Sequence, residues 1–178
     1  MSTPPSKTNN KICPCLWFDN NAGEAVTFYV NLFNSSPRAS SMPSSSIQQT
    51  THMPNETSSE SGPVISIFFN LGDQKYMALN GGPTFKFTPA VSLMVMCTDQ
   101  EEIDHFWDGI AGGVADREMN CGWVTDQYGL SWQIVPQYIR DLVEQETDRN
   151  KYNKLSAWMM KTMPKKLVIE DMVTAVEV

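Results

Sequence analysis

The stretch VSLMVMCTDQEEIDHFWDGI, residues 91–110, joins an apolar run to a helical stripe and decides the predicted fold. Residues 91–97 read as a strand that ends just before Asp99, a residue type that favours turns and helix starts. The apolar residues that follow keep the i, i+3, i+4, i+7 spacing of one helix face: Ile103, Phe106, Trp107 and Ile110. We therefore predict a strand, a tight turn and a helix.

The same design occurs earlier in the chain. Residues 12–18 form an apolar run that stops at Asp19. A helix face with identical spacing follows: Ala25, Phe28, Tyr29 and Leu32. Two strand-helix units of one design indicate an internal repeat, in which each half needs the other to bury its apolar surface.

Each half continues with strand signals. Residues 64–71 and 75–80 flank a glycine turn and predict a hairpin. Residues 114–123 and 130–136 predict the matching pair in the second half. The predicted fold class is α+β: two βαβββ modules whose eight strands form a curled half-barrel sheet over a cleft, with helices on the convex side.

This reading divides the chain into three parts. Residues 1–10 are expected to be a disordered N-terminus, and residues 11–136 a single domain with modules at 11–82 and 88–136. Residues 137–178 are expected to form a C-terminal helical extension. The extension carries apolar stripes but few turns, so it must pack on the domain, which we favour, or on a second subunit.

Residues 35–63, rich in serine, interrupt the first module. The segment has little to bury, so we expect a largely disordered excursion. The alternative is a lid over the cleft, for which the apolar residues are Met42, Ile47, Met53 and Pro54.

Charge excludes several classes of partner. The 178 residues hold 13 Lys and Arg against 20 Asp and Glu, a net charge of −7. Nucleic acids and anionic membranes call for a basic surface, so neither is an expected partner. The sequence lacks an apolar run of membrane-spanning length and the pattern of a signal peptide, and the expected location is cytoplasmic. The four cysteines lack C-x-x-C pairing and are expected to be free thiols.

Several motifs in fixed order resemble one family: Pro14-Cys-Leu-Trp-Phe-Asp-Asn-Asn-Ala22, Ala25-Val-Thr-Phe-Tyr29, Leu79-Asn-Gly-Gly-Pro-Thr-Phe-Lys-Phe87, Cys121-Gly-Trp123 and Asp126-Gln-Tyr-Gly-Leu-Ser-Trp-Gln-Ile-Val-Pro136. Together they resemble the PhnB-like branch of the vicinal oxygen chelate (glyoxalase/bleomycin-resistance) superfamily. The resemblance implies paired βαβββ modules and a homodimer. Many members carry the label 3-demethylubiquinone methyltransferase. We do not extend that activity to this chain, because it has no Gly-rich strand-to-helix loop for a nucleotide-like cofactor.

The resemblance also implies positions for metal ligands. In metal-using members, His, Gln and Glu of the first and last strands of each module hold a divalent ion. Carried over by spacing, these positions are Ser92 and Gln133 in the second module, and Ile12 or Pro14 with Asn80 in the first. No His or carboxylate stands there, and neutral oxygens alone rarely hold a cation. We predict neither a metal nor another cofactor.

Strand alternation then assigns the lining of the cleft. Side chains in phase with Asn80, Ser92 and Gln133 are expected to face inward: Pro14, Leu16, Tyr76, Ala78, Met94, Met96, Ser131 and Val135. Cys121 and Trp123 are expected at the mouth. An apolar wall with a few amides and hydroxyls is typical of a site for an organic molecule. The alternative is a filled core in which the amides bond to each other or to backbone.

Two functions remain. The first is a metal-independent enzyme that isomerises, cyclises or eliminates from an organic metabolite. In it, Asn80, Ser92, Gln133 or Tyr76 would hydrogen-bond to a carbonyl or enolate as charge develops. The second is a binding or sequestration protein from which the ligand leaves unchanged. Both take a small organic molecule as partner, and we favour the enzyme.

Overall fold

The computed structural model describes residues 11–54, 62–144 and 149–177. The expected disordered N-terminus, residues 1–10, lies outside the described residues, as do residues 55–61 near the end of the serine-rich segment. The chain divides into two compact units. The first unit comprises residues 1–34 and 42–85, and the second unit residues 35–41 and 86–178. The strands form two mixed sheets that do not close into a barrel.

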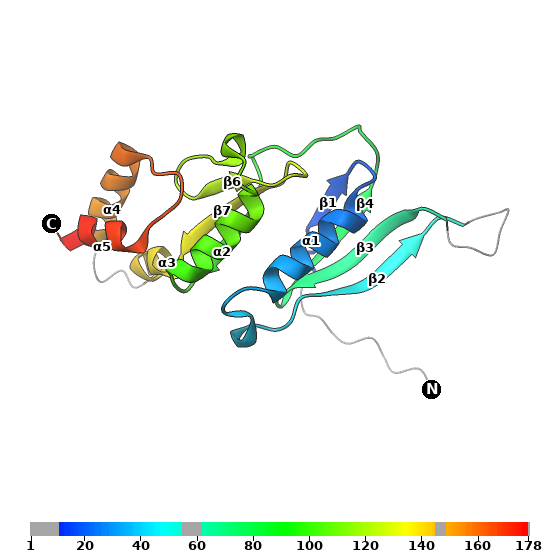
Figure 1. Cartoon of the computed structure of the whole chain (residues 1–178), viewed down its shortest axis with the longest axis horizontal. Helices are drawn as coiled ribbons and strands as arrows, with labels where there is room; N and C mark the ends of the chain where they lie inside the picture. Colours follow the sequence, from blue (N-terminus) through cyan, green and yellow to red (C-terminus); the bar gives the residue numbers. More distant parts are fainter. Residues whose placement is uncertain (1–10, 55–61, 145–148, 178) are drawn as a thin grey trace. The chain divides into compact units, whose positions relative to one another are not determined.

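The first unit is a four-stranded sheet with one helix. Its elements are β1 (Cys15–Phe18), α1 (Ala22–Asn34), β2 (Ser46–His52), β3 (Val64–Leu71) and β4 (Gln74–Asn80). The strand order is β1-β4-β3-β2, with β1 parallel to β4 and the other pairs antiparallel. Helix α1 covers one face of this sheet (Figure 1). Its apolar stripe, including Ala25, Tyr29 and Leu32, is buried there, as the spacing predicted.

The second unit repeats this plan. It contains β5 (Ser92–Cys97), α2 (Gln100–Ala111), β6 (Trp123–Thr125) and β7 (Ser131–Pro136) in the order β5-β7-β6. Again the opening strand runs parallel to the closing strand, and the middle strand is antiparallel to it. The predicted α+β class with paired strand-helix modules is therefore confirmed.

The predicted strand at residues 114–123 is wrong. Ala115–Arg117 form a 3-10 helix, η2, and strand pairing before β6 begins at Trp123 is limited to an isolated bridge from Glu118 to Val124. Left-handed backbone at Cys121 and Gly122, with φ of 59° and 80°, breaks the extended run just before β6. The described residues accordingly hold seven strands instead of the eight expected.

The serine-rich segment is more ordered than expected. Seven of its residues form β2, an edge strand antiparallel to β3. The Asn34 side chain fastens its start, because Nδ2 donates to the Ser45 carbonyl and Oδ1 accepts from the Ser45 amide, both at 2.9 Å. An edge strand is held by main-chain hydrogen bonds, so it forms without an apolar face. Residues 35–41 contain the 3-10 helix η1 (Ala39–Ser41) and belong to the second unit.

Asp99 begins α2 and anchors that segment. Its Oδ1 accepts the Glu102 amide at 3.0 Å, the geometry of a helix N-cap. Its Oδ2 accepts the Arg38 Nε–H at 2.7 Å, and this partner lowers the pKa of the Asp99 carboxyl. Gly112, at φ 60°, ends the helix in the left-handed conformation that glycine adopts most readily.

The C-terminal extension packs on the second unit, as we favoured. It forms α3 (Gln137–Glu144), α4 (Arg149–Thr162) and α5 (Ile169–Glu177). The extension shares one apolar cluster with β7: Val135, Leu155, Leu167, Met172 and Val176. Polar links add to it, since the Gln100 side chain accepts the Ile169 amide at 2.9 Å. In the described parts of the chain, no helix has both the length and the apolarity that crossing a membrane requires.

Candidate functional site

The sheet of the second unit has two faces with different coverings. On β7, Trp132 and Ile134 are fully buried on the side of α2. Gln133 and its neighbours two residues away point to the opposite face. The strand register places Met94 and Trp123 beside Gln133, and Ser92 beside Ser131. This opposite face is the floor of the candidate site.

A cavity of about 540 Å³ lies over this floor. Six of the predicted residues line it: Met94, Met96, Cys121, Trp123, Gln133 and Val135. The remaining walls come from α3 and α4: Ile139, Arg140, Val143, Glu144, Tyr152, Leu155, Ser156, Met159 and Met160. None of these nine residues was predicted at the site from the sequence. Their helical stripes were recognisable, but a stripe does not say which surface it packs against.

The polar part of the floor is the Gln133 amide, which is bonded to the Ser92 hydroxyl just outside the cavity lining. Gln133 Nε2 donates to Ser92 Oγ at 2.7 Å, and both residues are half-buried. Because the hydroxyl accepts this bond, its own proton is available to another acceptor. The Gln133 carbonyl oxygen is likewise available to a donor. The floor therefore offers a ligand the uncharged Gln133 amide, with its carbonyl oxygen as acceptor and its second N–H as donor. Ser131 pairs with Ser92 in the ladder but is buried outside the cavity lining.

The charged side chains of the lining neutralise each other. Arg140 Nε donates to Glu144 Oε1 at 2.7 Å across one turn of α3. The carboxylate raises the pKa of the Arg140 guanidinium through this hydrogen bond and through its charge. Both side chains are at least half exposed, so the pair belongs to the rim and adds little to stability.

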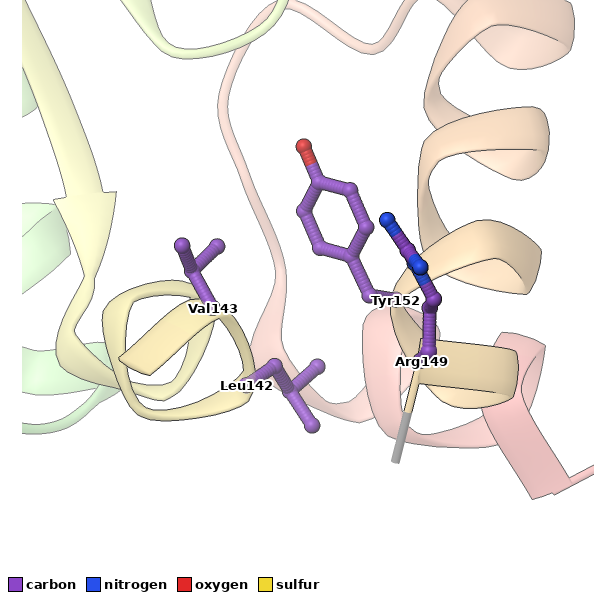
Figure 2. Close-up of a pocket in the computed structure, with 4 residues that line it drawn as sticks. All are labelled: Leu142, Val143, Arg149 and Tyr152. Atoms are coloured by element: carbon purple, nitrogen blue, oxygen red, sulfur yellow. The ribbon is translucent and has the colours of Figure 1, made fainter. Parts of the chain in front are cut away.

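A second hollow of about 370 Å³ shares two lining residues, Val143 and Tyr152, with the larger cavity (Figure 2). Its described lining joins Leu142 and Val143 of α3 to Arg149 and Tyr152 at the start of α4. Figure 2 shows Arg149 and Tyr152 rising side by side from α4, with Val143 across from the tyrosine ring. The larger cavity also includes Val143 and Tyr152. Helices α3 and α4 of the extension thus supply the described lining of this hollow and much of the larger cavity's wall.

Cys121 stands in a tightly held turn at the cavity. Its backbone N–H donates to the Pro164 carbonyl, and the Gly122 N–H donates to the Lys165 carbonyl at 2.9 Å. A side chain at Gly122 would put its Cβ 2.6 Å from the Ile134 carbonyl oxygen, so glycine is required there. Across the described residues, no three His, Cys, Asp or Glu side chains gather into a possible metal cluster.

The predicted residues of the first unit do not face the open side of their sheet. Leu16, 6% exposed, and Ala78, fully buried, lie under α1. The alternation that the sequence suggested for this module is therefore one residue out of phase. Both faces of β4 carry apolar side chains, so the pattern does not distinguish them, and a slip of one position exchanges the faces.

The side chains of Asn80 and Tyr76 stabilise the fold of the first unit. Asn80 Oδ1 accepts the Ala22 amide at 2.9 Å, and its Nδ2 donates to the Val64 carbonyl at 3.1 Å. The side chain thereby holds the start of α1 to the sheet. Tyr76 stacks on the buried Phe69 with ring centroids 5.4 Å apart, and burial raises the pKa of the Tyr76 hydroxyl. Pro14 accepts the Met77 amide through its carbonyl.

Comparing the two units corrects the carried-over positions. Phe18 and Cys97 each end the opening strand and are buried. Counting back from them, the counterpart of Ser92 is Cys13, where the sequence count gave Ile12 or Pro14. Because Cys15 pairs with Met77 as Met94 pairs with Gln133, the counterpart of Gln133 is Met77 rather than Asn80.

This corrected set does not fit the divalent ion of metal-using relatives. A hydroxyl, an amide, a thiol and a thioether occupy the four positions, where those relatives supply imidazole and carboxylate ligands. Zinc sites use several thiolate, imidazole or carboxylate ligands, and Ca²⁺ and Mg²⁺ sites use carboxylate oxygens, whereas a single thiol is the only such group in this set. We therefore derive no chemical step through a metal here.

Two repeated units of this topology define the class of protein as glyoxalase-like. A family model described as 3-demethylubiquinone-9 3-methyltransferase matches residues 10–135. The chain belongs to this family, in its PhnB-like branch. No curated protein matches the chain.

One solved structure supports this assignment. A putative 3-demethylubiquinone-9 3-methyltransferase, PhnB protein, from Bacillus cereus is 31% identical, with a TM-score of 0.57. That alignment covers 71% of this chain and 99% of the Bacillus protein. A protein from Pseudomonas aeruginosa is 17% identical over 71% of this chain and 97% of its own, with a TM-score of 0.49.

Proposed function

We propose that this protein binds a small organic molecule in the cavity of the second unit. One observation carries the proposal: about 540 Å³ of space has mainly apolar walls, with the neutral Gln133 amide on its floor. Pockets of several hundred cubic ångströms with few convergent polar groups are the usual form of sites for small organic ligands. The apolar walls supply affinity, and the Gln133 side chain, held by its hydrogen bond to Ser92, orients the ligand.

Binding without conversion is the function that the geometry supports best. Of the four side chains expected to act in catalysis, Asn80 and Tyr76 belong to the first unit and hold its helix and sheet. Gln133 lines the cavity, and Ser92 lies outside the lining and is hydrogen-bonded to Gln133. They are neutral hydrogen-bonding groups, which suit the recognition of a carbonyl or hydroxyl.

Catalysis is the second candidate, and the Gln133–Ser92 pair is the observation that favours it. Hydrogen bonds from this pair could stabilise the charge that develops on a carbonyl oxygen during isomerisation, cyclisation or elimination. The methyl transfer in the family's name is not part of the proposal. The turn before α1 is Asp19-Asn20-Asn21 and the turn before α2 is Thr98-Asp99, so neither has the glycines that cradle a nucleotide-like cofactor.

The test is a screen of organic metabolites against the full chain carrying ¹³C-methyl methionine. We expect ligands to shift the methyl signals of Met94 and Met96, assigned from single Met→Leu variants. Met96→Trp should fill part of the cavity and weaken binding at least about tenfold, because the bulky ring occupies the ligand's space. The matched control Met163→Trp changes a half-exposed methionine outside the lining and should leave binding unchanged.

Recovery of the ligand then separates the two candidates. An unchanged ligand after long incubation supports binding, and Gln133→Leu should then lower affinity alone. A converted ligand supports catalysis, and the same substitution should then lower the turnover rate at saturating ligand. A screen in which no ligand moves the cavity methionines contradicts the proposed function.

A further inference from the structure

We propose that the ligand is an uncharged, flat aromatic molecule that binds between the sheet and the C-terminal extension. This inference rests on the proposed function and narrows it to one chemical class. It depends on three features of the cavity: where its walls come from, which atoms they present and how their charges are paired.

The outer wall belongs to a part of the chain beyond the family core. The family match ends at residue 135, and nine of the fifteen lining residues lie between 139 and 160. The sheet floor is thus common to the family region, whereas the covering wall comes from α3 and α4. A site with a floor and a facing wall favours a ligand with two flat faces, because both faces can then be covered at once.

The two walls both present methionine. Met94 and Met96 come from β5, and Met159 and Met160 come from α4. Their thioethers are polarizable and make favourable contacts with aromatic rings, and their unbranched side chains adapt to a ligand's outline. Trp123 and Tyr152 add aromatic surface from the floor and the wall, respectively. Saturated molecules can use the apolar area but cannot use these ring contacts.

Charge pairing selects an uncharged ligand. Arg140 and Glu144, the two charged residues of the lining, are bonded to each other. A charged ligand would lose its hydration among apolar side chains without gaining an unpaired partner. The neutral Gln133 amide instead suits a single hydroxyl or carbonyl group on the ring.

Matched probes test the class directly. We would titrate the ¹³C-methyl methionine protein at neutral pH with 2-naphthol, its saturated counterpart decahydro-2-naphthol, and 2-naphthoate. All three are of similar size, and only 2-naphthol is both flat and uncharged. We expect 2-naphthol to bind at least about tenfold more tightly than either alternative, a difference readily resolved in dissociation constants. Ring currents should move the methyl signals of Met94, Met96, Met159 and Met160 together.

Variants test the role of the thioethers. Met96→Leu with Met159→Leu keeps apolar volume and removes one thioether from each wall. The double variant should bind 2-naphthol several-fold more weakly and decahydro-2-naphthol equally well. Met163→Leu, outside the lining, is the control and should behave as wild type.

Three outcomes overturn the inference. Equal affinity for 2-naphthol and decahydro-2-naphthol, or tighter binding of 2-naphthoate, contradicts the aromatic, uncharged class and leaves the proposed binding function standing. Shifts confined to Met94 and Met96 contradict the role of the α4 wall. Failure of 2-naphthol to move any cavity methionine overturns the inference, whereas the proposed function fails only if the wider metabolite screen also finds nothing.

Discussion

The Trp17 side chain explains why glycine is needed at position 81, in the Gly81-Gly82 pair that follows β4. The Trp17 ring lies against Gly81, and its Nε1–H donates to the Gly82 carbonyl at 2.8 Å. Phe85 completes the contact edge-on, with ring centroids 5.0 Å apart. The turn after β4 is therefore held down by an indole that any side chain at Gly81 would displace.

The space around Gly81 and around Gly23 predicts opposite effects on stability when each glycine is replaced by alanine. A Cβ at Gly81 would lie 2.2 Å from the Trp17 ring, so Gly81→Ala should lower the free energy of unfolding by about 1–3 kcal/mol. At Gly23 in α1, the nearest atom to a new Cβ is 4.0 Å away. Gly23→Ala should raise the free energy of unfolding by up to about 1 kcal/mol, because alanine loses less backbone entropy in a helix. Urea denaturation measures both, and a stable Gly81→Ala protein would contradict the packing described.

At the scale of elements, the extension is part of the second unit's core. Leu155 of α4 is 1% exposed and belongs to the cluster that includes Val135 of β7. Lys166 adds ion pairs to Asp104 at 2.8 Å and Asp108 at 3.0 Å on α2. Apolar packing is the larger contribution, because these ion pairs are partly exposed to solvent.

Leu155→Ala should therefore destabilise the protein by about 2–5 kcal/mol, the range for deleting a buried leucine side chain. It should also weaken ligand binding, since Leu155 lines the cavity. Met160→Ala, at a residue 74% exposed on the same helix, should cost much less stability. Equal losses of stability in the two variants would contradict the packing of α4 on β7.

At the scale of the whole molecule, the four cysteines are free and differ in accessibility. Cys13 and Cys15 are exposed, Cys121 is half-buried and Cys97 is fully buried. Burial raises the pKa of the Cys97 thiol, and the charges of Glu102 and Asp99 raise it further. Since the thiolate is the reactive form, both effects protect Cys97.

A thiol-reactive aromatic disulfide should accordingly label native protein in stages. Cys13 and Cys15 should react first, Cys121 more slowly, and Cys97 only after unfolding in denaturant. A double Cys13→Ser, Cys15→Ser variant should lose the fast phase. Labelling of Cys97 at the rate of the exposed thiols would contradict the burial of β5 against α2. The homodimer and the exclusion of nucleic acid by the −7 charge stay predictions at this scale.

The sequence by itself determined the repeated strand-turn-helix units and the residues that begin them. The i, i+3, i+4, i+7 stripes and the cap at Asp99 are local signals, since they depend on neighbours within one or two turns. The floor residues Met94 and Met96 followed from alternation along β5 in phase with Ser92, a position that, like Gln133 on β7, came from the family resemblance.

Only the tertiary structure decided which face of β4 is covered and what closes the cavity. Asn80 and Met77 are three residues apart on one strand with apolar side chains on both faces, so no local pattern distinguishes the side under α1. Met159 and Tyr152 line the same cavity as the floor residues because α4 packs near β7, where Leu155 and Val135 share one apolar cluster. The burial of apolar surface between segments far apart in the sequence decides this packing. The spacing of apolar residues within a helix shows which face is buried but not which strand or helix covers it.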